Sequence, residues 1–488
     1  MLRLLLVAAL AIVLVDPQIA QAQEPEKAPT AVGRGGAAAT VDALGTEAAI
    51  RVLRRGGNAV DAAVAAAAVL GVTEPFSCGI GGGGFMVIRT PGGKVTTIDS
   101  REESPSAMRP DSFIEDGTPL TLNEARYSGL SAGVPGTVAG WERALRRYGS
   151  WSLRRALRPG IEVARDGFTV DPTFVSQTVP NIDWFDDIPS SAELYLDDDG
   201  TARDEGDTLV NRDLARTYRL IADRGARGFY RGELARAMAD AAQDPPTAAD
   251  ANHAWRPGLM TAKDVKRYEA LERRPTRIGY RGLDVWGMGP PSSGGSTVGE
   301  ALNILEGYPD LDDPDRTRAL HLFLEASRFA FADRNAFLAD PDFFDVPLAG
   351  LLSDEYAAER RELIDVEQAA TSPVEPGDPN PYSSTTHLVV SDRHGTVVSY
   401  TFTIESTGGG GIVVPGYGFL LNNELTDFNP VPLFAGVPDP NLPAPGKRPR
   451  SSMSPTIVFR DGKPVVAVGS PGGATIITTV LQILVEHL

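Results

Sequence analysis

The most informative stretch of this 488-residue chain is Ser383-Ser384-Thr385-Thr386-His387-Leu388-Val389-Val390-Ser391-Asp392. Residues 365–384, which lead into it, are rich in proline and poor in apolar residues, and they predict an exposed linker. The apolar and β-branched residues that follow predict a buried strand with a threonine at its start. A threonine that becomes a chain terminus can use its own α-amine as the base for its hydroxyl, so no histidine is required. The stretch therefore points to an N-terminal nucleophile.

A β-hairpin is predicted around this threonine. Residues 386–391 and 396–404 have the pattern of two strands, and Asp392-Arg393-His394-Gly395 has the composition of a turn. Ordinary cross-strand register places Thr385 within about one residue of Thr403. A second hydroxyl would then lie beside the first.

Other polar groups gather in the C-terminal region. Asn422-Asn423-Glu424-Leu425-Thr426-Asp427 contains two carboxylates three residues apart, and Ser451-Ser452 follows a second proline-rich loop, residues 429–449. Pro471-Gly472-Gly473 opens a predicted final helix, where free backbone N–H groups collect and an anion is favoured. Each feature alone is most often a turn or a cap. Together with the strand-initial threonine they predict an amidase site.

The rest of the chain predicts mixed α and β structure. Residues 40–53 have the pattern of a helix, and residues 59–70 are apolar nearly all round, which predicts a buried helix. Two strands are expected within residues 85–99, after a glycine-rich connection. Residues 120–363 are expected to be mostly helical with loops, and residues 456–468 to form another hairpin.

Composition narrows the class of protein. The formal net charge of −18 argues against a nucleic acid or an anionic membrane surface as partner. Arg3, the apolar residues 4–15 and Ala20-Gln21-Ala22 have the order of a secretory signal peptide, which we expect to span residues 1–22. We therefore expect export to a periplasm or outside the cell, with no membrane span after removal of the signal. The single cysteine, Cys78, excludes an internal disulfide framework and is expected to be a small buried residue.

Several motifs have structural explanations. Residues 79–84 match G-x-G-x-x-G, but a dinucleotide site needs a strand before the motif and a helix after it, and here the order is reversed. Gly129-Leu130-Ser131-Ala132-Gly133 matches the G-x-S-x-G elbow of serine hydrolases without the required strand ahead and helix behind. Asp197-Asp198-Asp199-Gly200 lacks the spacing of a calcium loop, and no metal-ligand spacing is found, so no metal is predicted. His387 is expected to be a hydrogen-bonded sheet residue, although a ligand or base remains an alternative.

Seven motifs, in order along the chain, resemble the γ-glutamyltransferase (γ-glutamyltranspeptidase) family of N-terminal nucleophile hydrolases. They are Gly-Gly-Asn-Ala-Val-Asp-Ala-Ala at 56–63, Gly-Gly-Gly-Gly-Phe-Met at 81–86, Pro-Pro-Ser-Ser-Gly-Gly at 290–295, Thr-Thr-His at 385–387, Leu-Leu-Asn-Asn-Glu at 420–424, Ser-Ser-Met-Ser-Pro-Thr at 451–456 and Gly-Ser-Pro-Gly-Gly at 469–473. The resemblance implies an α+β fold, a single-domain four-layer αββα sandwich. It also implies a precursor that cuts itself between Ser384 and Thr385 into a large subunit, residues 23–384, and a small subunit, residues 385–488. Against the family's usual length, the C-terminus at Leu488 is expected to be short.

The resemblance assigns the catalytic groups. Thr385 matches the nucleophile, Thr403 the threonine that orients it, and Gly472 and Gly473 the oxyanion-hole glycines. The freed α-amine, with a reference pKa of about 7.7–8.0, would take the proton while the hydroxyl oxygen attacks a γ-glutamyl amide. The γ-glutamyl group would then pass to water or to an amino acid or peptide.

The resemblance also assigns the substrate's head group. Arg101 matches the arginine that pairs with the α-carboxylate, and Ser451 and Ser452 would assist it. Glu424 and Asp427 would hold the α-ammonium. Glu405 stands where many family members have asparagine, and it adds negative charge near the ammonium.

The expected function is cleavage of glutathione and related γ-glutamyl compounds, without a cofactor. The expected partners are these small molecules, amino acid or peptide acceptors, and the two subunits for each other. One alternative is an acylase for glutaryl or cephalosporin side chains, and a glutaryl group lacks the ammonium. The others are an unprocessed peptide-binding homologue and, more distantly, a serine esterase that uses Ser131.

Overall fold

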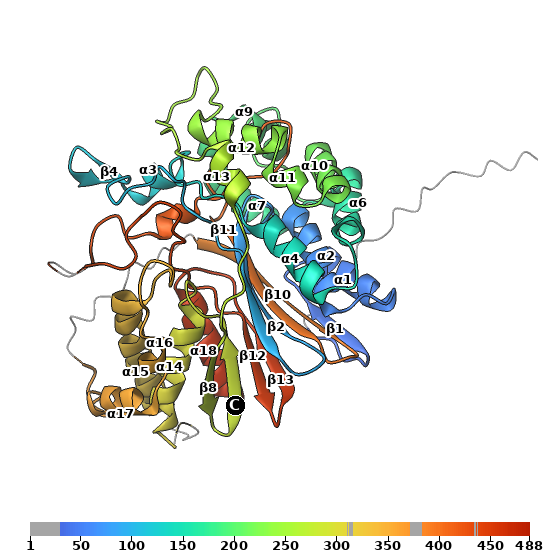
Figure 1. Cartoon of the computed structure of the whole chain (residues 1–488). Helices are drawn as coiled ribbons and strands as arrows, with labels where there is room; N and C mark the ends of the chain where they lie inside the picture. Colours follow the sequence, from blue (N-terminus) through green and yellow to red (C-terminus); the bar gives the residue numbers. More distant parts are fainter. Residues whose placement is uncertain (1–29, 310, 312–315, 371–382, 434–435, 437) are drawn as a thin grey trace, which may run out of the picture.

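The computed structural model describes residues 30–488 except 310, 312–315, 371–382, 434–435 and 437 (Figure 1). The predicted signal peptide and most of the predicted linker lie outside the described residues. Two antiparallel sheets occupy the centre, one with the strand order β1-β10-β11-β2-β3 and the other with the order β13-β12-β9-β8. The first sheet consists of β1 (Gly36–Ala39), β10 (Ser383–Asp392), β11 (Val397–Ser406), β2 (Gly83–Arg89) and β3 (Val95–Asp99); the second consists of β13 (Lys463–Val468), β12 (Thr456–Arg460), β9 (Leu283–Gly287) and β8 (Thr276–Tyr280).

Helices cover the outer face of each sheet, so the chain forms the predicted α+β sandwich of four layers (Figure 1). The first sheet is covered by α1 (Ala43–Arg54), α2 (Ala59–Thr73) and α4 (Thr137–Tyr148). The second is covered by α14 (Gly294–Glu306), against which α15 (Arg316–Phe337) and α18 (Thr475–His487) pack. The remaining elements are β4 (Ile114–Glu115), β5 (Thr118–Pro119), α3 (Leu122–Arg126), α5 (Leu153–Ala156), α6 (Arg158–Asp166), β6 (Phe168–Thr169), α7 (Pro172–Thr178), η1 (Val179–Asn181), α8 (Ile182–Phe185), α9 (Pro189–Tyr195), β7 (Thr208–Leu209), α10 (Arg212–Arg224), α11 (Arg227–Tyr230), α12 (Glu233–Gln243), α13 (Ala262–Arg267), α16 (Leu348–Leu351), α17 (Asp354–Glu362) and η2 (Glu424–Asp427).

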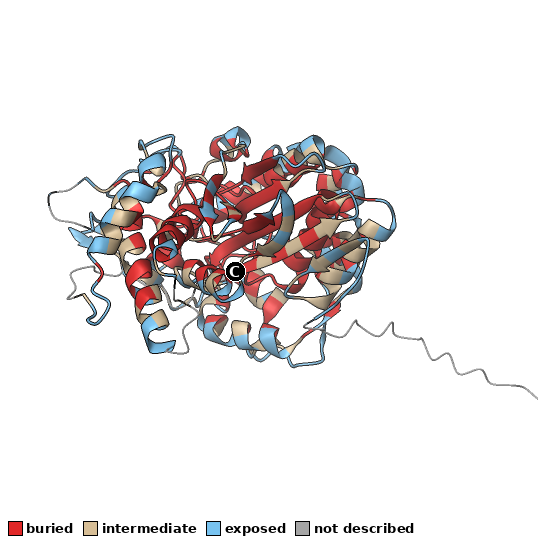
Figure 2. Cartoon of the chain, turned by 90° about the horizontal axis from the view of Figure 1, so that it is seen from below, coloured by how far each residue is buried: buried red, intermediate tan, exposed pale blue. Residues whose placement is uncertain are grey.

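Strand β2 shows how the layers share one core. Every residue from Gly83 to Ile88 is buried, because both faces of the strand are covered. Met86 and Ile88 belong to the core beneath α2, whereas Phe85 and Val87 belong to the core shared with the second sheet. Successive side chains of a strand point to opposite faces, so one strand serves two apolar layers. Figure 2 shows much of the interior buried and the outer faces of the helices exposed, while β8 alternates buried and exposed residues and β13 is mostly intermediate or exposed.

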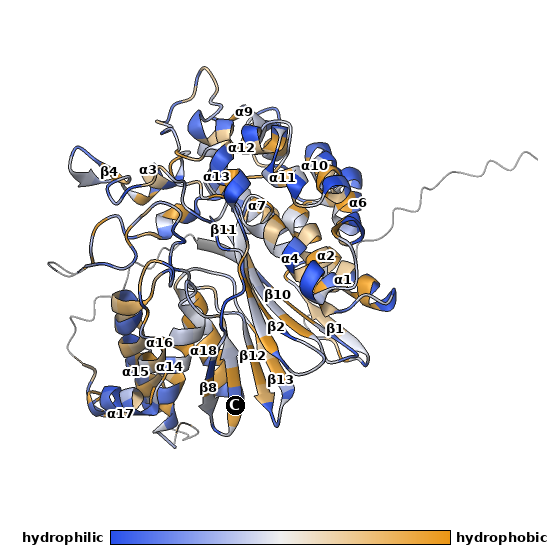
Figure 3. Cartoon of the chain, in the orientation of Figure 1, coloured by the Kyte–Doolittle hydropathy of each residue, from blue (hydrophilic) through white to orange (hydrophobic). Residues whose placement is uncertain are grey.

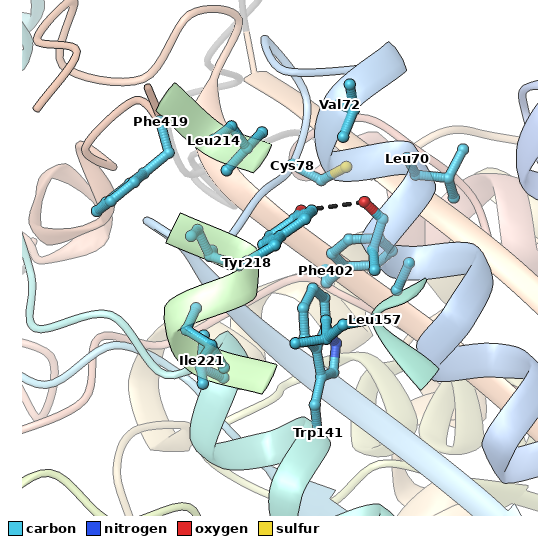
Figure 4. Packing of buried hydrophobic residues seen from close by; sticks show 14 of the residues in the cluster. Leu70, Val72, Cys78, Trp141, Leu157, Leu214, Tyr218, Ile221, Phe402 and Phe419 are labelled. Carbon is cyan, nitrogen blue, oxygen red and sulfur yellow. Dashed lines mark hydrogen bonds between the residues drawn. The ribbon is translucent and has the colours of Figure 1, made fainter. Parts of the chain in front are cut away.

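Helix α2 is buried along its whole length, as its all-round apolar sequence predicts. Asn58 and Asp61 close its N-terminus with a capping box. Figure 4 shows the packing against this helix, where the Tyr218 hydroxyl donates a hydrogen bond to the Ala68 carbonyl oxygen at 3.0 Å. Cys78 lies in the same core and is 1% exposed, which confirms the expected small buried residue.

Hairpin β8–β9 departs from the expectation of a mostly helical middle region. Its two strands supply half of the second sheet, and β9 pairs with β12. The pattern was present in the sequence, because Thr276, Ile278 and Tyr280 are buried and alternate with exposed neighbours. The turn at Arg281-Gly282 has positive φ at both residues, as a tight hairpin turn requires.

The described residues contain no helix that is both long enough and apolar enough to cross a membrane. Apolar residues lie along the strands and the inner sides of the helices, and polar residues lie on the outer sides (Figure 3).

Candidate active site

The two predicted threonines are cross-strand partners. Thr385 on β10 lies directly opposite Thr403 on β11, and its Oγ1 donates a hydrogen bond to Thr403 Oγ1 at 3.3 Å. Thr403 Oγ1 also accepts a hydrogen bond from the backbone N–H of Glu405 at 2.8 Å. The predicted register is therefore confirmed, and it brings one hydroxyl within reach of the other. The ladder has a register shift between Ser383 and Thr385, around the predicted cleavage bond.

A pocket of about 220 Å³ opens beside this pair. Its lining comes from α3, α15, β10, β11, η2, the loops around residues 428–433 and 450–453, and the start of α18, which are far apart in the sequence. All the predicted catalytic and substrate-binding residues except Arg101 line it: Thr385, Thr403, Glu405, Glu424, Asp427, Ser451, Ser452, Gly472 and Gly473. The fold thus gathers these residues into one cavity.

Gly472 and Gly473 lie immediately before α18, which begins at Thr475 rather than near Gly473. No side chain caps the N-terminus of this helix, so side chains do not occupy its first N–H groups. Gly472 has φ of +114°, a conformation that side chains rarely allow. These features suit a backbone donor that faces a developing negative charge.

Arg101 lies behind the pocket wall. It is 1% exposed, and its Nη1 and Nη2 atoms form ion pairs with Glu424 and Asp427. Its Nε and Nη2 atoms also donate to the carbonyl oxygens of Pro449 and Arg450, each at 3.2 Å. The family resemblance assigns Arg101 to the α-carboxylate of the substrate and the two carboxylates to its α-ammonium. In this structure the arginine and the carboxylates pair with each other instead.

Glu405 is buried next to the threonine pair and has φ of +79°. Its carboxyl group accepts hydrogen bonds from Asn423 Nδ2 and Ser406 Oγ. Burial and, to a smaller extent, the charge of Asp427 raise the pKa of Glu405 to about 7, against the lowering effect of the two hydrogen bonds. The group therefore titrates near neutral pH.

Sequence reasoning missed two groups at this site. Arg334 on α15 lines the pocket. It donates to Ser293 Oγ at 2.8 Å and to Ser452 Oγ at 2.9 Å, and the second bond fixes the orientation of the Ser452 side chain. Glu102 follows Arg101 and is completely buried beside the carboxyl of Glu424. Only the adjacency of Glu102 to Arg101 in the sequence could have signalled it.

His387 and Ser131 lie outside this pocket. His387 Nδ1 is hydrogen-bonded to Thr401 Oγ1 at 2.8 Å, and burial lowers the pKa of His387 to about 3, so the ring is neutral. Ser131 is completely buried, and its Oγ donates to the Arg126 carbonyl oxygen at 2.8 Å. The serine-hydrolase alternative is therefore wrong for the described residues, because Ser131 is not accessible to a substrate.

Comparisons with known proteins agree with this geometry. The family model for gamma-glutamyltranspeptidase matches residues 45–488. The chain is 39% identical to the glutathione hydrolase proenzyme of Bacillus subtilis (strain 168), with 99% of the chain and 84% of that protein aligned. It is 40% identical to the glutathione hydrolase proenzyme of Escherichia coli (strain K12), with 93% of the chain and 78% of that protein aligned.

A solved structure with the same fold is the cephalosporin acylase from Bacillus halodurans. It superimposes with a TM-score of 0.76 at 28% sequence identity, and the match covers 95% of the chain and 83% of the acylase. Proteins named for both activities that the sequence suggested thus occur among those similar to this chain in sequence or in structure.

Proposed function

The chain belongs to the gamma-glutamyltranspeptidase family, and from this membership we propose that its pocket cleaves γ-glutamyl amides, including glutathione, through a γ-glutamyl ester on Thr385. The observation that carries the proposal is the Thr385–Thr403 pair, which opens into the same pocket as two backbone glycines and three carboxylates. The chain is an enzyme of γ-glutamyl hydrolysis and transfer, and water or the amine of an amino acid or peptide accepts the acyl group.

Maturation uses the same hydroxyl as catalysis. Thr385 Oγ1 attacks the carbonyl carbon of Ser384, and the peptide nitrogen leaves as the α-amine of Thr385. Water then hydrolyses the resulting ester, which leaves a carboxylate on Ser384 and a free hydroxyl and amine on Thr385. We propose that the two subunits, residues 23–384 after removal of a signal peptide and residues 385–488, stay together because β10 lies between β1 and β11 in one sheet.

In the mature enzyme the Thr385 amine takes the hydroxyl proton while the oxygen attacks the γ-carbonyl carbon of the donor. Thr403 holds the attacking oxygen in position. The N–H groups at Gly472 and Gly473 stabilise the oxyanion of the tetrahedral intermediate. The protonated amine then gives its proton to the leaving nitrogen, and a second attack by water or an acceptor amine releases the acyl group.

The head group of the donor enters a site that is already occupied by an internal ion pair. An α-carboxylate can replace a protein carboxylate on Arg101, and the α-ammonium can bind the released Glu424 and Asp427. Such an exchange keeps every buried charge paired, which matters because an unpaired buried charge is costly. Ser451 and Ser452 supply hydroxyl donors beside the carboxylate.

The acylase alternative is less well supported by the pocket. A glutaryl group has no ammonium, and it would leave Glu405, Glu424 and Asp427 as three carboxylates around a group without positive charge. A zwitterionic γ-glutamyl group complements them. Export remains a proposal that rests on the signal-like residues 1–22.

The test compares the native chain with Thr385→Ala. The native protein should give two bands on a denaturing gel, with Thr385 as the first residue of the smaller fragment, and should hydrolyse a γ-glutamyl anilide. Thr385→Ala should remain one chain and lose activity by several orders of magnitude, because the nucleophile is absent. Thr386→Ser is the matched control, since Thr386 pairs with Phe402 on the opposite face of the sheet. An active native protein with an uncut chain would contradict the proposal.

A further inference from the structure

Negative charge is in excess around Arg101. Glu424 and Asp427 contact its guanidinium, and the carboxyl of Glu102 lies against that of Glu424. Asp427 is one-third exposed, whereas Glu102 and Glu424 are buried. One buried arginine therefore faces three carboxyl groups, of which two are at most 1% exposed.

The surroundings of Glu102 give its carboxyl no cationic or side-chain donor other than Glu424. Apart from its own backbone N–H and the Glu424 carboxyl, neither oxygen of Glu102 accepts a hydrogen bond from any described residue, and Glu424 Oε2 has no other donor there. The backbones of Gly83 and Gly133 enclose the side chain, since a Cβ on Gly83 would lie 2.6 Å from Glu102 Oε2. Two buried carboxyls in contact repel each other unless one of them holds a proton that both share.

Groups on the other elements packed around the pair do not supply the missing charge. The phenols of Tyr230 on α11 and Tyr400 on β11 remain neutral, because burial raises the pKa of both, so neither adds a charge that acts on Glu102. The other arginines nearby donate to groups outside the pair. Arg126 donates to the carbonyl oxygens of Thr407 and Gly409, and Arg448 forms ion pairs with Asp99 and Glu103. Arg334 donates to Ser293 and Ser452, and Arg450 to the carbonyl oxygens of Arg334 and Asn335. Burial also raises the pKa of Glu102 to about 7, against the opposing effect of Arg101, and raises that of Glu424.

We propose that Glu102 and Glu424 share one proton in the empty site and that the α-ammonium of the substrate displaces this proton to solvent. Glu102 is then a positioning residue that acts through Glu424 and makes the site select donors that carry an ammonium. The shared proton leaves as the ammonium of the substrate arrives. The net charge of the buried site is therefore unchanged by this exchange. The inference rests on the proposed function, because it requires a γ-glutamyl head group in this pocket.

L-Glutamate and glutarate provide the test on the mature enzyme, since they share both carboxylates and differ in the ammonium. Titration calorimetry in buffers of different ionisation enthalpy measures the protons released by each ligand. At pH 6, glutamate should release about one proton more than glutarate, and the difference should vanish near pH 8.5. The affinity for glutamate should fall about tenfold from pH 8 to pH 6, relative to that for glutarate. Equal proton release by the two ligands would overturn the proposal.

Two variants locate the proton. Glu102→Gln should remove the difference between glutamate and glutarate, because an amide cannot release a proton. Glu103→Gln is the matched control: its carboxyl faces Arg448 at 2.6 Å, and the difference should persist. A difference that persists in Glu102→Gln would place the proton elsewhere and overturn the assignment. If Glu102→Gln does not mature, the difference in proton release between glutamate and glutarate on the native enzyme still tests the proposal.

The same samples separate this inference from the proposed function. Glutamate that fails to compete with a γ-glutamyl anilide would count against the pocket's function. Glutamate that competes without releasing an additional proton would leave the function intact and remove only the role of Glu102.

Discussion

The two faces of the strand pair β10–β11 have opposite chemistry. Toward α2, the pair presents Leu388, Val390, Tyr400 and Phe402, all of them completely buried in one apolar core. Toward the second sheet and the pocket, the same strands present polar groups: Thr385, His387, Ser399, Thr401 and Thr403.

Within this pair of strands, one face therefore holds the backbone in place and the other face carries the polar groups of the pocket. Apolar packing on the α2 face holds the backbone, and the backbone in turn holds two hydroxyls 3.3 Å apart on the other face. The polar face is itself paired, since Thr401 binds His387 and Ser399 donates to the Val468 carbonyl oxygen of β13 at 3.2 Å. Substitutions on the apolar face should therefore affect stability, and those at the pocket end of the polar face should affect the rate.

Phe402→Ala should have the largest effect on the apolar face. Phe402 is completely buried, and its ring stacks on Tyr400 with centroids 4.5 Å apart. Loss of the ring should lower the free energy of unfolding by about 3–5 kcal/mol. Urea unfolding of the uncut Thr385→Ala chain measures this change on a single polypeptide.

Phe402→Leu is the matched control and should cost substantially less, because it fills most of the volume. Phe402→Ala protein that is folded and mature should retain its kcat. A large loss of kcat in folded protein would show that the two faces are not separable.

Thr403→Val should have the next largest effect, on the polar face. The variant keeps the shape of the side chain but removes the oxygen that accepts from Thr385 and from the Glu405 N–H. We expect kcat for a γ-glutamyl anilide to fall by about 10–100-fold, which corresponds to roughly 1–3 kcal/mol.

Thr401→Val, two residues further along the same face, is the control. It lies against His387 rather than Thr385, so kcat should stay within a few-fold of the native value. An equal loss of kcat in both variants would assign the effect to strand packing instead of to the hydroxyl of Thr403.

His387→Gln should have the smallest effect, and only in acid. The pKa of His387 is about 3 in the folded chain and about 6.5 in an unfolded one, so the unfolded chain binds more protons between these values. Stability should therefore be complete above pH 6.5 and fall as the pH decreases, with a loss of about 2 kcal/mol at pH 5. In His387→Gln, the decrease in unfolding free energy from pH 7.5 to pH 5 should be smaller by this amount.

His394→Gln is the matched control, because His394 is exposed in the turn of the same hairpin. It should leave the acid dependence unchanged. A native-like acid dependence in His387→Gln would show that other groups destabilise the chain in acid.

The sequence predicted those elements whose structure depends on residues close together in the chain. The register of Thr385 with Thr403 followed from a hairpin with a recognisable turn, and the burial of α2 followed from its composition. Hairpin β8–β9 had the same kind of signal but lay in a region dominated by helices, and it was overlooked. The G-x-S-x-G motif matched by sequence alone, and its serine is sealed in the interior.

The sequence by itself determined the strand pair, the face that carries Thr385 and Thr403 and the family, because alternation, turn chemistry and motif order are properties of neighbouring residues. Tertiary structure alone decided that Arg101 meets Glu424 across 323 positions of sequence and that Glu102 lies against the same carboxyl. The physical reason is that an ion pair depends on distance and burial, and neither quantity can be derived from residues that come together only when the whole chain folds.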